Sequence, residues 1–288
     1  MDAIRVTNSC GFALAILAIE PFALLSCAMK NYLWRTLGTL GFALMAHALS
    51  AQTVTDNFAT GANWSLSSIP LVGGGTTSFG TNRLDYIVGT PTASDMAGRA
   101  WLPSVGLFDN AWSMQVDVHL SDLSLGLGKF ANLNLSVSNG SNNMTAAIDQ
   151  RNFGSSVHEF ASFINYGSVG SPYVTAVTDG TLYISYATAG NGTLTASFSS
   201  PSIAGGALQT LDTFTNVGTA WSMTSGSTFN IGLVGFSGGG GVNLNTGAAY
   251  FSNFQATGLT AVPEPSTYAA LMGVAVLGVA AIRRRKKS

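Results

Sequence analysis

The chain has 288 residues, of which 47% are hydrophobic and only 9% are charged, and 34 are glycine. This length can bury one sizeable core, and a glycine-rich composition with little charge is typical of exported β proteins and rare in cytosolic enzymes. Between residues 52 and 262, four basic residues stand against ten acidic ones, and this net charge of −6 argues against nucleic acid as a partner. Both cysteines, Cys10 and Cys27, precede residue 50, so the rest of the chain offers neither a disulfide nor a cysteine nucleophile.

The segment that begins at Met29 has the three parts of a secretory signal peptide. A basic start leads into an apolar stretch over residues 37–49 and then into small residues. We therefore expect a signal peptide over residues 29–51, cleaved after Ala48 or Ala51, and export by the secretion machinery.

Residues 1–28 lie ahead of this complete signal peptide and contain another apolar stretch. We expect Met29 to be the natural start, which would make residues 1–28 a spurious extension of the reading frame. The alternative is a lipoprotein site in "LLSC", with Cys27 as the acylated residue. The signal peptide that follows argues against that alternative.

The chain ends with a Pro-Glu-Pro turn, an apolar run and a basic cluster. Pro263 and Pro265 prevent a helix from running back into the preceding body. The apolar run at residues 268–282 is short for a membrane-spanning helix, which needs about 20 residues. The basic cluster would stay on the cytoplasmic side and leave the body across the membrane. It consists of Arg283, Arg284, Arg285, Lys286 and Lys287.

This tail resembles the PEP-CTERM sorting signal of Gram-negative bacteria over residues 261–288. The residues that carry the resemblance are Val262, Pro263, Glu264 and Pro265, followed by the apolar helix and the basic stop. The resemblance implies that an exosortase-type transpeptidase recognises and cuts the Pro-Glu-Pro region, and that the helix is a temporary transmembrane anchor. The alternative is a permanent membrane anchor with the same topology.

Period-two alternation is the main signal in the body and predicts β-strands with one buried face and one wet face. The turn sequences Asn139-Gly140, Asp179-Gly180 and Gly190-Asn191-Gly192 predict hairpins. No amphipathic helix of three turns is expected between residues 52 and 262. Together these features predict an all-β domain over residues 52–260, a single jelly-roll β-sandwich. The expected strands are 112–120, 132–138, 157–164, 173–177, 182–186, 193–198, 229–236 and 250–256.

Two segments, residues 179–198 and 229–255, resemble the back half of lectin and laminin-G domains of the concanavalin A-like superfamily. Each has the family's order of a strand, a glycine turn and a further strand. The segment "DNFATGANWSL" at residues 56–66 resembles the family's first strand, which implies that the two ends of the body meet in one sheet.

Carboxylates and histidines give weak signals for catalysis. Glu159 is the single glutamate of the body, and the spacing of a glucanase active site is absent. Asp117 and Asp122 form a looser acidic pair, Asp117 and His119 share one strand face, and His158 adjoins Glu159. A solvated surface is the simpler interpretation of all of them. We therefore predict no catalytic residue and no enzyme activity.

Other candidates concern metal binding and nucleophiles. A structural calcium ion could be held by Asp109-Asn110 or Asn142-Asn143, although no ligand is assigned and no other cofactor is expected. Ser237 lies among glycines but lacks the spacing of a nucleophile elbow. A flexible loop is the expected role of that glycine run.

Exposed aromatic side chains are the remaining candidates, because sugar rings stack on them. Trp112 is expected in the core, and burial is also favoured over sugar contact for Trp64, Trp101 and Trp221. We predict an exported cell-surface or extracellular-matrix protein whose body contacts extracellular polysaccharide or has a structural role. The alternatives are an exported glycan-active enzyme, which would show two carboxylates facing each other in a groove, and a purely structural coat protein without a pocket.

Overall fold

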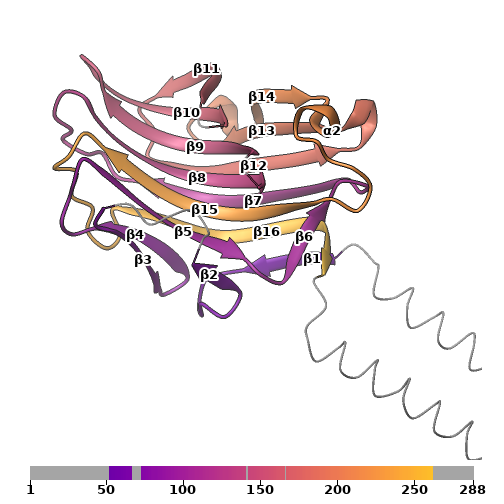
Figure 1. Cartoon of the computed structure of the whole chain (residues 1–288). Helices are drawn as coiled ribbons and strands as arrows, with labels where there is room; N and C mark the ends of the chain where they lie inside the picture. Colours follow the sequence, from indigo (N-terminus) through magenta and orange to yellow (C-terminus); the bar gives the residue numbers. More distant parts are fainter. Residues whose placement is uncertain (1–51, 67–72, 141, 166, 262–288) are drawn as a thin grey trace, which may run out of the picture. The chain divides into compact units, whose positions relative to one another are not determined.

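The computed structural model describes residues 52–66, 73–140, 142–165 and 167–261, which form an antiparallel β-sandwich (Figure 1). The predicted signal peptide, the sorting residues, the apolar helix at 268–282 and the basic stop lie outside these described residues. Within the described part of the chain, no helix is long and apolar enough to cross a membrane.

Strands dominate the described chain, and the helical elements are one short α-helix and two 3-10 turns. The helical elements are η1 (Ala189–Asn191), η2 (Ala204–Gly206) and α2 (Val217–Ala220). The strands are β1 (Gln52–Asp56), β2 (Trp64–Leu66), β3 (Gly75–Gly80), β4 (Arg83–Val88), β5 (Ser94–Trp101), β6 (Ser104–Leu107), β7 (Trp112–Leu120), β8 (Lys129–Asn139), β9 (Asn142–Asn152), β10 (Ser156–Ile164), β11 (Gly167–Thr175), β12 (Asp179–Ala187), β13 (Thr193–Ser199), β14 (Gln209–Thr215), β15 (Thr228–Gly238) and β16 (Ala249–Ala261).

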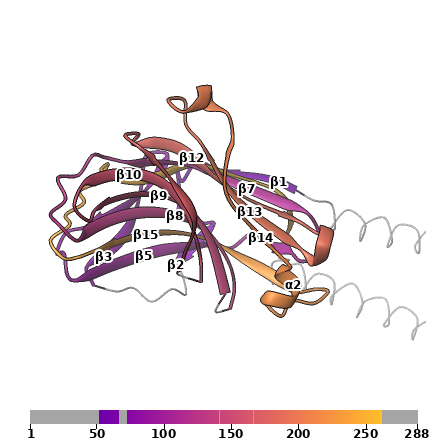
Figure 2. The same cartoon turned by 90° about the horizontal axis from the view of Figure 1, so that it is seen from above.

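The strands form two sheets. The first, called sheet I here, has the order β3-β4-β16-β7-β12-β13-β14, and β1 also pairs with β16. The second, sheet II, has the order β2-β5-β15-β8-β9-β10-β11. Strand β6 pairs with both β15 and β16 and so joins the two sheets. Figure 2 shows the curvature of sheet II across β5, β15, β8, β9 and β10.

The core lies between the sheets and is built by the alternation of the strands. On β7 the residues from Trp112 to Leu120 alternate between buried side chains and side chains that are exposed or half-buried. Phe160 of β10 stacks on Phe198 of β13, with ring centroids 4.2 Å apart, and the two rings connect the sheets. Burying one such large apolar side chain stabilises the fold by about 1.5–3 kcal/mol.

The predicted strands are confirmed, and so are two of the three predicted turns. Asn139-Gly140 joins β8 to β9, and the turn around Asn191 joins β12 to β13. The hairpin predicted at Asp179-Gly180 is wrong, because β11 pairs with β10 while β12 pairs with β7 and β13. The chain instead crosses from sheet II to sheet I there, since both edges of β12 are already occupied.

The single strand predicted over residues 56–66 is also wrong. Asp56 ends β1 of sheet I, residues 57–63 form a loop, and Trp64–Leu66 form β2 of sheet II. The Asp56 carboxylate holds the loop, since it accepts hydrogen bonds from Phe58 N at 2.6 Å and from Trp64 Nε1 at 3.2 Å. The expected meeting of the two ends of the body is confirmed, because β1 pairs with β16.

Candidate functional site

A groove of about 270 Å³ runs over the outer face of sheet II, and we call it the sheet II groove. Its polar side chains come from the outward positions of β8 and β9, and apolar side chains from β5, β10, β15 and the β9–β10 turn surround them. The lining residues are Met96, Phe130, Asn132, Asn134, Ser136, Asn143, Thr145, Asp149, Arg151, Phe153, Phe163, Val234 and Phe236.

The outward side chains of β8 are buried although they face away from the core. Asn132, Asn134 and Ser136 are only 6–8% exposed. The Asn134 amide donates to Asn132 Oδ1 at 2.7 Å and to the Val234 carbonyl at 3.2 Å. These amides therefore form a fixed polar row along the groove, with the Phe130 ring packed edge-on against Phe236 beside it.

Three buried polar atoms that line the groove have no hydrogen-bond partner among the described residues. They are Asn143 Oδ1, Thr145 Oγ1 and Asp149 Oδ1, all on the outward face of β9. An unpaired buried polar group costs about 1–3 kcal/mol, so native proteins rarely keep several of them side by side. Their positions in one groove indicate a place where a polar ligand would complete the hydrogen bonds.

Two carboxyl groups meet at one end of this polar row. Asp149 of β9 and Glu159 of β10 are cross-strand partners, and they hydrogen bond with each other. Burial and, after it, the neighbouring charge of Glu159 raise the pKa of Asp149 to about 7, while Arg151 and Asn132 oppose the shift. Burial also raises the pKa of Glu159, against the effect of Arg151, whose Nη2 lies 2.7 Å from Glu159 Oε2.

In this arrangement Asp149 and Glu159 share a proton, and the charge of Arg151 is neutralised by Glu159. With a pKa of about 7, Asp149 holds a proton up to near-neutral pH and shares it with Glu159, because two adjacent buried carboxylates repel each other. The positive charge of Arg151 is matched by Glu159. The groove therefore carries hydrogen-bonding groups but little net charge at neutral pH.

All four tryptophans considered for sugar stacking are buried, as expected. Trp64, Trp101, Trp112 and Trp221 are 2–6% exposed, and Trp64 packs edge-on against Trp101 with ring centroids 5.0 Å apart. They belong to the core and do not line the groove. The aromatic rings of the groove are phenylalanines, which the sequence did not single out.

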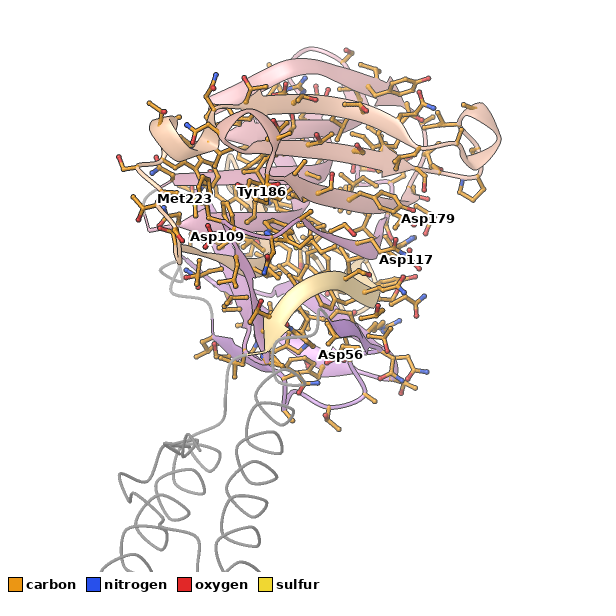
Figure 3. All side chains as sticks on the ribbon, turned by 90° about the vertical axis from the view of Figure 1, so that its right-hand side faces the viewer. Asp56, Asp109, Asp117, Asp179, Tyr186 and Met223 are labelled. Atoms are coloured by element: carbon orange, nitrogen blue, oxygen red, sulfur yellow. The ribbon has the colours of Figure 1, made fainter. Side chains whose placement is uncertain are left out.

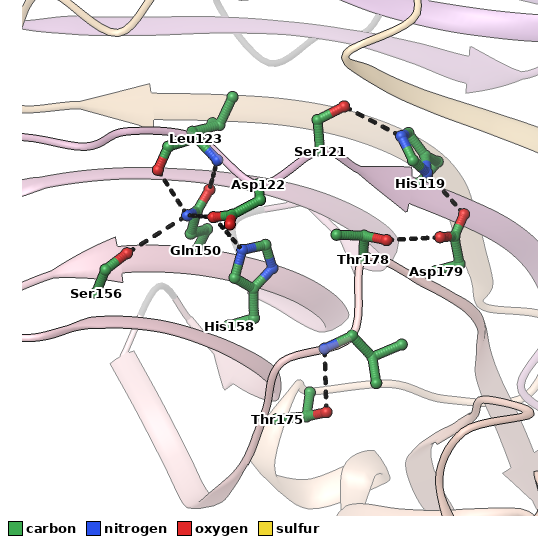
Figure 4. Close-up of polar contacts among 11 residues, drawn as sticks. His119, Ser121, Asp122, Leu123, Gln150, Ser156, His158, Thr175, Thr178 and Asp179 are labelled. Atoms are coloured by element: carbon green, nitrogen blue, oxygen red, sulfur yellow. Dashed lines mark hydrogen bonds and ion pairs between the residues drawn. The ribbon is translucent and has the colours of Figure 1, made fainter.

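The acidic and histidine candidates of the sequence bind other partners in the structure. His119 contacts Asp179, and His158 contacts Asp122 at 3.3 Å (Figure 4). Asp117 instead accepts hydrogen bonds from Thr181 Oγ1 at 2.6 Å and from Asn253 Nδ2 at 2.8 Å.

The two calcium candidates lie in different parts of the fold: Asn142 and Asn143 begin β9, where Asn143 lines the sheet II groove, and Asp109 precedes β7. Figure 3 shows Asp109 on the opposite side of the sandwich from Asp117 and Asp179. The Asp109 carboxylate accepts hydrogen bonds from Ser225 Oγ at 3.1 Å and from Gly226 N at 2.7 Å. Among the described residues, no group of three His, Cys, Asp or Glu side chains could hold a metal ion.

Ser237 points into the core and has a structural partner. It is fully buried, and its hydroxyl lies 3.2 Å from the hydroxyl of Tyr86, which also donates to the Asp95 carbonyl at 2.7 Å. Gly235 makes room for this tyrosine, because a Cβ at that position would overlap the ring. Gly238, the first residue of the glycine run, is the last residue of β15, and the positive φ angles of this run belong to residues 239–241 after the strand.

The comparison with protein families identifies the C-terminal segment. The PEP-CTERM protein-sorting motif matches residues 261–286. The chain carries a PEP-CTERM sorting motif in this segment. The motif indicates an exported protein and implies sorting by an exosortase, in agreement with the resemblance found in the sequence.

Solved structures similar to this PEP-CTERM protein include lectins of the legume type. Lectin II from Ulex europaeus has 13% identity and a TM-score of 0.48, and the match covers 72% of this chain and 97% of the lectin. Peanut lectin with a nine-residue peptide has 7% identity and a TM-score of 0.47, over 75% of this chain and 100% of that one. A module of a Lactobacillus casei phage J-1 Dit protein has 8% identity and a TM-score of 0.45, over 74% of this chain and 98% of that one. No curated protein matches the chain.

Proposed function

We propose that this exported protein binds an uncharged polysaccharide chain in the sheet II groove and does not cleave it. The observation that carries the proposal is the row of partnerless atoms at Asn143, Thr145 and Asp149. Two of these atoms are acceptors and the third is a hydroxyl, so their natural complement is a ligand rich in hydroxyl groups. The surrounding rings, such as Phe130 and Phe236, supply apolar faces on which the C–H faces of sugars pack.

The charges of the groove favour an uncharged sugar over an acidic one. Among the lining residues Arg151 is the cation, and its guanidinium is already paired with Glu159 at 2.7 Å. A uronate would find no free cation there and would approach the acidic pair instead. Hydroxyl groups of a neutral glycan, in contrast, can donate to the oxygens that lack partners.

The acidic pair supports binding rather than cleavage of glycosidic bonds. Two facing carboxylates in a groove were the expected mark of a glycan-active enzyme, and Asp149 and Glu159 meet that description in part. They hydrogen bond with each other, however, whereas glycosidases hold their two carboxyl groups about 5–9.5 Å apart to admit the sugar. No sugar atom fits between two groups that share a proton.

Thr145→Val tests the proposal because it removes one partnerless hydroxyl and keeps the shape of the side chain. We expect about 5- to 30-fold weaker binding to a neutral polysaccharide, as one hydrogen bond contributes roughly 1–2 kcal/mol. The measurement is calorimetric titration with neutral glucans and with polysaccharide extracted from the producing cells, next to the acidic polymer alginate. The control is Thr195→Val, a half-buried threonine of β13 in sheet I. Equal affinity of the two variants, or tighter binding of alginate by the native protein, would contradict the proposal.

We propose in addition that the tail is processed at the Pro-Glu-Pro region. Val262, Pro263, Glu264 and Pro265 would be recognised and cut by the exosortase, residues 268–282 would anchor the chain until then, and the basic residues 283–287 would stop transfer. The leader would be removed after Ala48 or Ala51. The match of the sorting motif to residues 261–286 supports this sequence of events.

Intact-mass analysis of the protein from cells with and without the exosortase tests the processing. We expect a mature mass that lacks both the leader and the tail, and retention of the whole tail in the strain without the exosortase. A complete tail in both strains would favour a permanent membrane anchor.

A further inference from the structure

At one end of β7, on the outer side of sheet I, the side chains of His119 and Ser121 meet that of Asp179, which lies 60 residues away from His119 in the sequence (Figure 4). His119 Nδ1 lies 2.6 Å from Asp179 Oδ1, and His119 Nε2 lies 3.1 Å from Ser121 Oγ. Strand register produces this contact, because Asp179 at the start of β12 is the cross-strand partner of His119. Ser121 follows immediately after the last residue of β7.

The hydrogen bonds set the tautomer of the imidazole. Although burial acts in the opposite direction, hydrogen bonds from Thr178 and His119 hold the pKa of Asp179 below its ordinary value, so its carboxylate is ionised at neutral pH. Thr178 Oγ1 donates to Asp179 Oδ2 at 2.7 Å and orients the carboxylate. The carboxylate can only accept from His119 Nδ1–H, and the lone pair of Nε2 is then left to accept the hydroxyl proton of Ser121.

Packing holds the imidazole ring in this orientation. Tyr250 of β16 is the other cross-strand partner of His119, and its ring stacks on the imidazole with centroids 4.9 Å apart and planes 23° apart. Arg83 covers the Tyr250 ring at 5.2 Å and is itself held by Asp85 at 3.0 Å. The base is therefore positioned before any ligand arrives, as a catalytic histidine must be.

We propose that Ser121, His119 and Asp179 form a hydrolytic triad that cleaves carboxylic esters, with Ser121 as the nucleophile. Ser121 Oγ attacks the ester carbonyl carbon while its proton moves to His119 Nε2, and Asp179 stabilises the imidazolium. The tetrahedral adduct expels the alcohol, which takes the proton from His119 and leaves an acyl-serine. Water, activated by the same imidazole, then releases the carboxylic acid and restores Ser121.

The surroundings indicate the class of ester. Asp179 is 61% exposed and Ser121 is half-buried, so the triad is open to solvent and suits an acyl group carried on a large ligand. Asp122 beside it is 82% exposed, and Asp117 lies on the same strand face as His119. This acidic surface favours an uncharged ester, such as an O-acetyl group on a neutral polymer.

The test uses the purified full chain in mild detergent, with a fluorophosphonate probe and with p-nitrophenyl acetate. We expect the probe to label Ser121, as located by peptide mass spectrometry, and Ser121→Ala to lower ester turnover by about 100-fold or more. His119→Gln is expected to abolish the labelling, and Asp179→Asn to reduce it strongly. The matched control is Ser156→Ala, an exposed serine of the neighbouring polar cluster that contacts Gln150 and no histidine.

Circular dichroism and thermal unfolding of each variant separate loss of the triad from loss of the fold. Absence of labelling at Ser121 in the folded native protein would overturn the proposal, and so would unchanged turnover in a folded Ser121→Ala variant. Polysaccharide binding in the sheet II groove is an independent readout, since Ser121→Ala leaves that groove intact. Failure of the triad therefore leaves the proposed binding function standing, and the reverse also holds.

Discussion

The outer faces of β7 and β8 read alike in the sequence but differ in the folded protein. Both strands alternate apolar and polar residues. On β7 the outward residues Ser113, Gln115 and Asp117 are exposed or half-buried, whereas Asn132 and Asn134 on β8 are almost completely buried. The difference arises because sheet II curves and carries bulky side chains over its outer face. A side chain that points away from the core is therefore not always exposed to solvent.

The two faces also differ in how their polar atoms are paired. On sheet I, Asp117 accepts hydrogen bonds from Thr181 and Asn253 at 2.6 and 2.8 Å. On sheet II, oxygens of Asn143, Thr145 and Asp149 are buried without partners among the described residues. The Asp117 carboxylate on the outer face of sheet I thus has its partners within the protein, whereas the proposed ligand of the sheet II groove would supply the donors that these three oxygens lack.

The largest effect expected from a single substitution comes from comparing the ion pairs of the two sheets. Arg151 pairs with Glu159 on sheet II, and Arg83 pairs with Asp85 on sheet I; both carboxylates are 1% exposed and both arginines are about one third exposed. Arg151→Met should lower the free energy of unfolding by about 3 kcal/mol at neutral pH, because it leaves a buried carboxylate without its cation. Arg83→Met should cost less, since Asp85 keeps the hydrogen bond from Gly247 N at 2.7 Å.

Urea unfolding at neutral and acidic pH measures the free energy of unfolding of Arg151→Met and Arg83→Met. The loss in Arg151→Met should shrink at acidic pH, where Glu159 takes up a proton and no longer needs a cation. If both variants lose the same free energy of unfolding, the hydrogen bond from Gly247 does not make Asp85 less dependent on its cation than Glu159 is.

The second effect concerns the pH dependence of stability and tests the shared proton of the groove. The folded protein holds the Asp149 proton up to a pKa of about 7, whereas the unfolded chain releases it near the ordinary value for aspartate. Between about pH 4 and 7 the folded state therefore binds more protons, and the free energy of unfolding falls as the pH rises. Over that range the loss should amount to roughly 2–4 kcal/mol, at about 1.4 kcal/mol for each unit.

Asp149→Asn removes this titration and keeps a donor for Glu159. We expect the stability of the variant, measured by urea unfolding, to depend less on pH than that of the native protein, with the difference growing up to about pH 7. Asp179→Asn on sheet I is the contrasting variant, because the pKa of Asp179 is lowered. Its carboxylate stabilises the native protein above the ordinary aspartate value and loses that effect as the pH falls. The same pH profile for both variants would contradict the assignment of the shared proton.

The strands could be predicted from the sequence where alternation was strict, as on β7 and β8, and the sorting tail could be predicted from its own residues. Strand β9 could not, because "NNMTAAIDQRN" places alanines on both faces and blurs the period. The groove was missed for the same reason, since its partnerless oxygens lie on β9. Outward polar residues on two successive strands were the available signal, but burial of an outer face depends on sheet curvature, which a local pattern does not contain.

The pairings between distant side chains were beyond the sequence for a different reason. Asp149 meets Glu159 only through the register of the β9–β10 hairpin, and His119 meets Asp179 across 60 residues through the register of β7 with β12. The sequence placed His119 and Asp117 on one strand face and favoured a solvated surface there, because a local pattern does not show which residues of other strands lie beside them. The wrong hairpin at Asp179-Gly180 concealed that β12 pairs with β7.

The smallest expected effect is on the free energy of unfolding, which two threonine-to-valine substitutions should change in opposite directions. Thr145→Val should raise the free energy of unfolding of the ligand-free protein by about 1 kcal/mol, because it removes a buried hydroxyl that has no partner. Thr181→Val should lower it by about 1 kcal/mol, because it removes the hydrogen bond to Asp117 on sheet I. Urea unfolding of the two variants, side by side, measures the difference.

Saturating neutral polysaccharide should make the native protein more stable than Thr145→Val, since the native hydroxyl then has a partner and the bound ligand stabilises the fold. If Thr145→Val destabilises the ligand-free protein as much as Thr181→Val does, the Thr145 hydroxyl already has a hydrogen-bond partner. The contrast between the sheet II groove and the outer face of sheet I would then be wrong at this residue.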